Sequence, residues 1–494
     1  MRALKETLGL TQPQAARLGA LLDAGNYLGH PVTGWVYDRI GPQGSCSLAA
    51  LLVGAAYGAI QLIVNRGGKS SLSRLVLGVA FFIVGLGSGL GYIAALGSTS
   101  KQFSDTVFVG RAVGVVAAGF GLSATLVALT YRWASFNYFF VVWAALVAAV
   151  NVVGAVGLRT RPRSNSGNSN PAPANVDQVF GIASARRLSS EDQQEEGELH
   201  LRQSYQILQS SSFLGSLEPG DLTSNGHSSN RDSNLSWTSW KRFEFWVLSM
   251  AFACLTGCGL FVINNMATVV QSFRNDGNTG SRSDSLAGGL VVLCSVCNCV
   301  GRLGMGVLVD KNTNVAKGKI SLMQSAAFVM SAGLAVTTAA TTYAVRHSSD
   351  DSFSMVGNAN ISSPLASLLL SALAVTVALT AVSYGAIFVV IVAIINERFG
   401  NTSVSGGCAK RRHFGKDYGL ILVGSALFGM VGNTLSAWMY QQHAENSSSN
   451  SGDEDDAFDV CFGAICYQGS FFLATVIAFC GGLLLQILIR HQGF

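Results

Sequence analysis

Long stretches without a charged residue constrain this chain more than any other feature of its sequence. Ten stretches of at least about 17 residues contain no Asp, Glu, Lys or Arg, and that length crosses a hydrocarbon core of about 30 Å. They are Ser45–Asn65, Leu75–Ser100, Ala112–Tyr131, Trp133–Leu158, Phe245–Phe273, Ser285–Gly301, Ile320–Val345, Ser352–Asn396, Tyr418–Ala444 and Val460–Ile489. An eleventh, Leu18–Asp38, is interrupted by Asp23. Because lipid cannot satisfy free backbone amides, we expect helices and an all-α membrane protein with eleven visible spans.

The composition agrees with a multi-pass membrane protein and excludes several functions. The sequence is 49% hydrophobic and 12% charged, which leaves too few polar groups to cover a water-soluble globule of this size. No basic patch interleaved with aromatic residues indicates a nucleic-acid partner. No phosphate-binding loop and no nucleophile elbow is present, so we expect neither an enzyme nor a cofactor. Sequence does not distinguish the plasma membrane from an internal one.

The distribution of Lys and Arg predicts the orientation of the spans. If the Asp38 end of the first span is cytosolic, alternation places 22 of the 32 basic residues on the cytosolic side. That excess follows the positive-inside rule, although the long central loop supplies much of it. The clearest local contrast is between Lys410, Arg411 and Arg412 on the inside and the acidic loop 441–469 on the outside.

A polar segment divides the chain into two membrane halves. Residues 159–241 are rich in Ser, Asn, Glu and Gln and cannot bury enough apolar surface to offset the entropy of ordering. We therefore expect an N-terminal half over 1–158, a disordered cytosolic linker over 159–241 and a C-terminal half over 242–494. Ser189 follows Arg186-Arg187-Leu188 and resembles a site for a basophilic kinase, with a chance match in a serine-rich tract as the alternative.

A short repeat lies at equivalent places in the two halves. The first copy has Gly34, Asp38, Arg39 and Gly41, and the second has Gly306, Asp310 and Lys311. Each copy therefore places a glycine four residues before an aspartate and a base at a helix end. The glycine permits a close helix crossing, and the charged pair can hold a neighbouring helix. Two copies indicate pseudo-symmetric halves that share a cytosolic gate.

These residues resemble the signature loop of the major facilitator superfamily, and further segments resemble its nodulin-like branch. The segments are Leu22-Asp23-Ala24-Gly25-Asn26, Tyr37-Asp38-Arg39-Ile40-Gly41-Pro42, Gly114 to Ser123, Ile263-Asn264-Asn265, Asn396-Glu397-Arg398-Phe399-Gly400 and Cys461 to Tyr467. The resemblance implies a fold of two six-helix halves and transport by alternating access.

Polar residues on the first span are candidates for the substrate or proton pathway. Asp23, Asn26, His30 and Thr33 follow one another at helical spacings of three or four and share one face. Ionisable groups inside a membrane are functional candidates, and a histidine can carry a proton near neutral pH. The alternative is that Asp23 is hydrated at the outer mouth and His30 bonds a neighbouring helix.

A second polar set lies on the span that opens the C-terminal half. It comprises Asn264, Asn265, Thr268 and Gln271, of which positions 264, 268 and 271 form one stripe. Such amides can bind a carboxylate or hydroxyl groups. The alternative is hydrogen bonding between helices.

Cysteines near the last span are candidates for a disulfide. Cys461 and Cys466 flank a short loop that the predicted orientation places outside, where a disulfide can form. Cys294 and Cys297 have Cys-x-x-Cys spacing but lie within a span without a second ligand pair, so we expect no metal site.

These features predict a secondary transporter of a small organic solute, with a carboxylate as candidate solute and a proton as candidate coupling ion. The alternative is a non-transporting receptor or scaffold with a regulated linker. Asp310 follows the start of its half at Phe245 by 65 residues, whereas 37 residues precede Asp38. We therefore expect that the first helix of the fold is missing, and that upstream codons in frame encode about 20 to 25 apolar residues.

The predicted orientation is testable through N-glycosylation. Asn360 and Asn446 begin Asn-x-Ser sequons expected outside, and Asn401 begins an Asn-x-Ser sequon expected in the cytosol. In a eukaryotic host, glycosidase-sensitive mass should disappear from the Asn360→Gln and Asn446→Gln variants and remain unchanged in Asn401→Gln. A glycan mapped to Asn401 by mass spectrometry would overturn the orientation.

Overall fold

The computed structural model describes most of both membrane halves. The described residues are 4, 7–10, 12–68, 70–103, 106–133, 136–158, 239–273, 280–312, 316–350, 364–399, 414–448, 461 and 463–490. Ser189 and nearly all of the expected linker lie outside them, as do Asn360, Asn401 and the basic residues 410–412.

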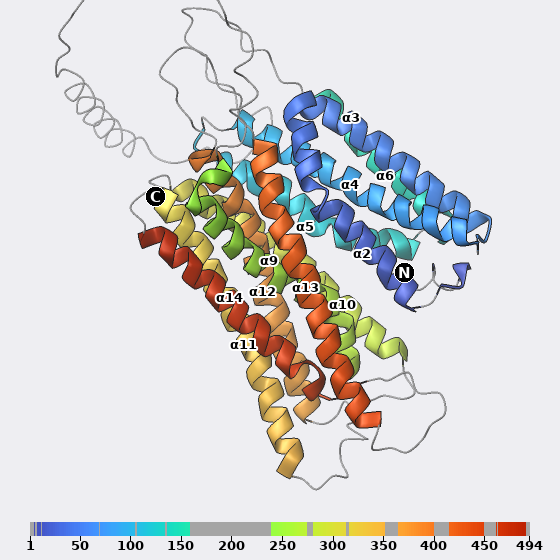
Figure 1. Ribbon diagram of the computed structural model, residues 1–494, viewed down its shortest axis with the longest axis vertical. Helices are drawn as coiled ribbons and strands as arrows, with labels where there is room; N and C mark the ends of the chain where they lie inside the picture. The colour runs from blue at the N-terminus through green and yellow to red at the C-terminus, as the bar shows by residue number, and fades with distance from the viewer. Residues whose placement is uncertain are drawn as a thin grey trace, which may run out of the picture. The chain divides into compact units, whose positions relative to one another are not determined.

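Helices make up the regular structure of the described residues (Figure 1). In the N-terminal half they are α2 Gln12–Tyr27, α3 His30–Asn65, α4 Ser71–Gln102, α5 Val109–Trp133 and α6 Phe136–Gly157. In the C-terminal half the short 3-10 helix η1 Ser239–Lys241 precedes α9 Phe243–Ser272, α10 Gly280–Lys311, α11 Ala316–Asp350, α12 Pro364–Arg398, α13 Phe414–Ser448 and α14 Ile465–Arg490.

The α3 helix contains the end of one membrane span and the whole of the next. Gly41 has φ of +74°, a left-handed conformation that glycine adopts without a Cβ clash, and Pro42 begins the next arm. Nine helical stretches of the described residues are long and apolar enough to span a membrane, and one of them, Arg17–Asn65, is 49 residues long. Counting the two arms of Arg17–Asn65, on either side of Gly41, as separate spans and adding α5 gives eleven spans. The prediction of an all-α, multi-pass membrane protein is therefore confirmed.

The first span is not the single continuous helix that the sequence suggested. It is broken between Tyr27, where α2 ends, and His30, where α3 begins. Pro31 explains the break, because proline has no N–H and its ring clashes with the carbonyl four residues earlier in a continuous helix. The polar face that we expected on this span therefore belongs to two helices.

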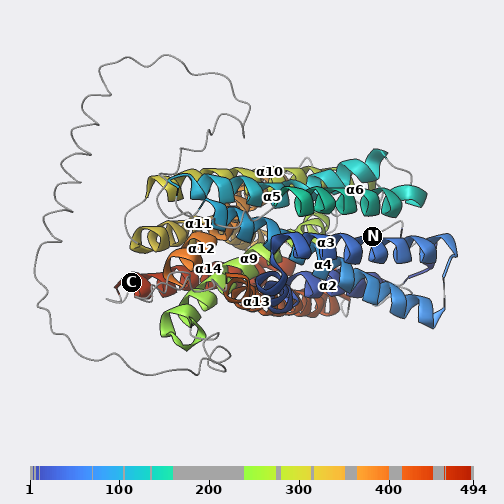
Figure 2. The same ribbon diagram turned by 90° about the horizontal axis from the view of Figure 1, so that it is seen from above.

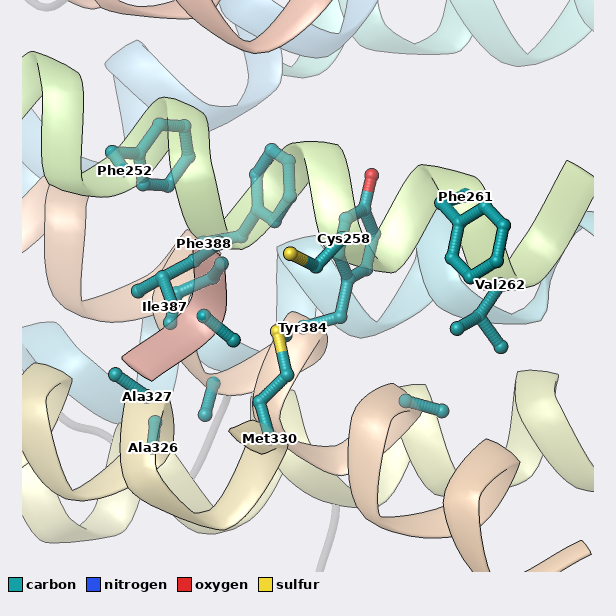
Figure 3. Close-up of a cluster of buried hydrophobic side chains, with 14 of the residues drawn as sticks. Phe252, Cys258, Phe261, Val262, Ala326, Ala327, Met330, Tyr384, Ile387 and Phe388 are labelled. Atoms are coloured by element: carbon teal, nitrogen blue, oxygen red, sulfur yellow. The ribbon is translucent and has the colours of Figure 1, made fainter. Parts of the chain in front are cut away.

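The two halves meet along two helix pairs. The α5 helix packs against α10, and α3 packs against α13, so each half contributes one helix to each pair (Figure 2). In the core of the C-terminal half, Phe252 of α9 contacts Phe388 of α12 edge to face at 5.3 Å between ring centroids (Figure 3). Met330 of α11 reaches the same cluster and is fully buried. This core fixes the helices that carry the site described next.

Candidate functional site

Asp38 of α3 caps the first turn of α13. The backbone N–H of Gly415 donates to Asp38 Oδ1 at 3.1 Å, and the N–H of Lys416 donates to Oδ2 at 3.0 Å. The first N–H groups of a helix have no partner within the helix and carry partial positive charge. A carboxylate from the N-terminal half therefore satisfies the start of a helix in the C-terminal half.

Asp310 of α10, in the C-terminal half, caps the first turn of α5 in the N-terminal half. It accepts from the N–H of Gly110 at 2.5 Å and from the N–H of Arg111 at 3.0 Å, in the first turn of α5. The Nε of Arg111 lies 3.4 Å from Asp310 Oδ2. The two aspartates of the repeat thus form pseudo-symmetric contacts between the halves. We call them the two caps.

The repeat glycines bring each capping helix close to its partner. A Cβ added at Gly34 would overlap the carbonyl oxygen of Gly415, and a Cβ added at Gly306 would approach that of Gly110 too closely. Residues four apart lie one above the other on a helix face. The glycine–aspartate spacing therefore seats the partner helix on the glycine and caps it with the aspartate one turn later.

The remaining motif residues have other roles at this end of the bundle. Gly41 forms the turn between the two arms of α3, as described above. Arg39 lies over the ring of Trp35, with 5.3 Å from Cζ to the ring centroid, and Lys311 is exposed at the end of α10. The base that contacts Asp310 comes from α5 rather than from the motif itself.

Arg302 lies fully buried between the halves. Its Nε donates to Asn298 Oδ1 at 2.9 Å, and its Nη1 donates to the carbonyl of Ala117 at 3.0 Å. Its guanidinium also stacks near Phe120 and Phe388, with Cζ 5.2 and 5.1 Å from the ring centroids. Within the described part of the chain Nη2 has no hydrogen-bond partner, and no carboxylate pairs with the guanidinium.

Tyrosines surround this arginine from both halves. The hydroxyl of Tyr92 in α4 accepts from Arg302 Nη1 at 3.4 Å. The hydroxyls of Tyr27 in α2 and Tyr384 in α12 lie 3.4 Å apart, so a pair of tyrosines also joins the two halves.

Asp23 and Asn264 line one pocket between the halves. This pocket measures about 290 Å³ including space open to solvent, and its other lining residues are Ala24, Tyr27, Leu260, Ala426, Gly429, Met430 and Asn433. Asn265 adds to its wall indirectly, because its Nδ2 donates to Asn433 Oδ1 at 3.0 Å. Candidates from the two polar sets of the sequence thus meet around one space.

Other predicted pathway residues lie outside this pocket. Asn26 and His30 face Gly89 of α4, where an added Cβ would contact both side chains. Buried His30 also lies 6.4 Å from the Tyr418 ring, and its Nδ1 has no partner among the described residues. Thr268 accepts from the hydroxyl of Tyr467 at 2.7 Å.

A disulfide joins Cys461 to Cys466 beside the far end of α9. Within this loop the N–H of Gly463 donates to the carbonyl of Ser272 at 2.8 Å, and the N–H of Cys461 donates to the Tyr440 hydroxyl at 3.0 Å. The loop therefore fixes the end of α9 opposite the two caps. Gln271, one residue before the end of α9, is exposed.

Sequence reasoning missed Arg302 as a site residue. The charge-free stretch Ser285–Gly301 ends just before Arg302, and the alternation of the spans places Arg302 on the cytosolic side. The structure continues α10 to Lys311, nine residues or about 14 Å further along the helix. Only uncharged residues lie between Arg302 and Asp310, and they are too few to form another span. This pattern indicates that the helix continues past Arg302 to Asp310.

Comparisons with known proteins agree on one family. The profile described as Major Facilitator Superfamily matches residues 1–374. A probable transporter, mch1, of Neurospora crassa is 23% identical over 536 aligned residues, covering 97% of this chain and 83% of that protein.

Solved structures show the same fold. A proton:xylose symporter of the major facilitator superfamily, solved with 6-bromo-6-deoxy-D-glucose bound, has a TM-score of 0.54 at 13% identity, with 98% of this chain and 88% of that one covered. A bacterial homologue of the iron transporter ferroportin gives 0.53 at 12% identity, covering 98% and 92%. A human organic anion transporter gives 0.51 at 13% identity, covering 98% and 88%.

Removing charge from a cap should destabilise the closed bundle. We expect Asp310→Asn and Asp38→Asn each to lower the free energy of unfolding by about 1–2 kcal/mol, because a charged acceptor at a helix start is lost. Thermal unfolding of the detergent-solubilised chain measures this. The control is Glu397→Gln, which removes the same charge from a partly exposed pair with Lys319 inside one half. Equal small shifts in all three variants would contradict the capping role.

Proposed function

The chain belongs to the Major Facilitator Superfamily, and from this premise we propose that it carries a small organic anion by alternating access. Its relatives are transporters, so the chain is a secondary transporter rather than an enzyme. The finer proposal concerns the solute and the coupling ion. It is supported above all by one observation, the buried Arg302 whose Nη2 has no partner in the described part of the chain.

A buried guanidinium without a carboxylate partner suits an anionic solute. Taking an unpaired charge out of water costs several kcal/mol, so such a residue is expected to gain its counter-charge from a ligand. The planar fork of arginine matches the two oxygens of a carboxylate. The rings of Phe120 and Phe388 leave an apolar surface beside that fork for the rest of the solute.

The contacts between the halves support a cycle for this solute. Both caps lie at the Asp38 end, which the sequence predicts to be cytosolic, and they close that end. The side chain of Asn396 also hydrogen bonds Ser100 across the halves there. A solute carboxylate that binds Nη1 and Nη2 side by side competes with the Ala117 carbonyl for Nη1. We propose that this exchange loosens the contact between α5 and α10 and favours opening.

Asp23 is the proposed proton carrier. It lines the pocket between the halves together with Tyr27, whose hydroxyl contacts that of Tyr384. A carboxylate that is protonated on one side and released on the other would couple anion entry to a proton. His30 is the second candidate, because it is buried beside Tyr418.

The anion proposal predicts a specific loss at Arg302. In vesicles reconstituted with the full chain, a panel of radiolabelled organic acids should show uptake that neutral and cationic solutes of similar size do not. We expect Arg302→Gln to lower that uptake at least about 100-fold, since a desolvated charge pair is lost, and Arg302→Lys to recover part of it. Arg346→Gln, an equal charge change at an exposed position of α11, is the control. Full anion uptake by Arg302→Gln would refute the proposal.

The coupling proposal predicts a different loss at Asp23. With acid outside the vesicles, the wild-type chain should accumulate the anion, and accumulation should fall as the outside pH approaches the inside pH. Asp23→Asn should abolish this pH-driven accumulation while anion exchange at equal pH persists. His30→Ala tests the second candidate in the same assay. Unaltered pH dependence in both variants would assign the two residues to packing.

A further inference from the structure

A crevice between α9, α13 and α14 lies apart from the transport residues. It measures about 380 Å³ including the space open to its surroundings, and it shares no lining residue with the pocket around Asp23. The α13 and α14 helices pack against α9 much more than against each other, which leaves the space between them. Exposed Trp438 and Phe472 mark the outer, lipid-facing surface of these two helices.

The crevice is apolar along most of its length and polar at one end. Cys254, Phe428 and Ile477 line the part nearer the middle of the helices, whereas Ser436 and Ser470 line the part nearer the disulfide loop. This polar end is the one opposite the two caps, because α14 begins there. No acidic or basic side chain of the described residues lines the crevice.

Ser436 presents an unsatisfied hydroxyl at the polar end. It is 2% exposed, and its Oγ has no hydrogen-bond partner among the described residues. A hydroxyl inside a membrane helix ordinarily bonds a carbonyl one turn earlier, as Thr434 of the same helix does with Met430 at 2.8 Å. A buried hydroxyl without a partner is unfavourable, so Ser436 is suited to a partner that the chain does not supply.

We propose that this crevice binds one membrane lipid of the sterol class, with its single hydroxyl on Ser436 and its apolar body along α9. Ser436 lies eight residues before Ala444, where the apolar span of α13 ends, or about 12 Å inside that span. A phospholipid would bring a charged phosphate to a crevice whose described lining has no basic residue to pair with it. A water-soluble solute would leave its polar groups against apolar walls.

The site connects to the gate through one helix. The α13 helix carries Ser436 in its second half, and its first turn carries the Gly415 N–H that donates to Asp38. A rigid lipid that joins α13 to α9 and α14 therefore acts on the same helix that the Asp38 carboxylate holds. Binding of the lipid is distinguishable from the transport proposal, because the crevice contains neither Arg302 nor Asp23.

Photolabelling of the full chain in vesicles tests the proposal. The probe is a sterol that carries a photoactivatable group on its apolar body, with crosslinks mapped by mass spectrometry. We expect labelled positions in the crevice segments of α9, α13 and α14, and we expect excess unlabelled sterol to remove them. Labelling spread over all lipid-facing helices, or equal competition by added phospholipid, would overturn the sterol site.

Two matched pairs of variants sharpen this test. A Cβ at Gly432 meets nothing within 4 Å, so Gly432→Leu fills the crevice without backbone overlap, and Gly119→Leu does the same on α5 away from it. We expect labelling to fall at least about fivefold in Gly432→Leu only.

The second pair tests the hydroxyl. Ser436→Ala should lower labelling by about fivefold. Ser425→Ala should not, although Ser425 is also a buried serine of α13 without a partner in the described residues. Wild-type labelling in both Gly432→Leu and Ser436→Ala would refute the site.

Discussion

Two carboxylates hold the ends of four helices together across the two halves. Asp38 and Asp310 each accept two backbone N–H groups from a helix that belongs to the other half. In a membrane protein these N–H groups cannot all turn to water, and a charged acceptor at a helix start contributes about 0.3–2 kcal/mol. Close glycine contacts lie one turn beneath each cap, so each cap and its glycine contact together join the halves at this end.

Arg302 contacts the same pair of helices, α5 and α10, that the Asp310 cap joins. The same helix, α10, carries Arg302 and Asp310 two turns apart, about 12 Å along the axis. Asp310 contacts the start of α5, and Arg302 contacts the Ala117 carbonyl further along α5. A solute that takes over the guanidinium thus weakens one of two contacts between the same pair of helices. This arrangement offers a physical route from solute binding to gate opening, which is the requirement for alternating access.

Hydrophobic length predicted the fold well, because a lipid core leaves few structures other than helices. The turn at Gly41 and the repeat at Asp38 and Asp310 were also readable, since glycine, proline and a spaced aspartate act through local geometry. The break before Pro31 was missed because we searched only for charges as span ends. Arg302 was missed for the same reason. Asp23 and Asn264 line the same pocket because of how the two halves pack against each other. A single sequence does not show which residues of the two halves come together.

Distances between spin labels on the two halves test the two-cap gate most directly. Labels at Ile40 of α3 and Lys317 of α11, in a chain whose free cysteines are replaced, report the separation of the halves at the capped end. Pulsed electron spin resonance on the reconstituted chain should give one short distance distribution. The Asp38→Asn, Asp310→Asn double variant should add a longer population, because each lost cap shifts the closed–open equilibrium by about fivefold or more. An identical, narrow distribution in the double variant would show that the carboxylates do not hold the gate.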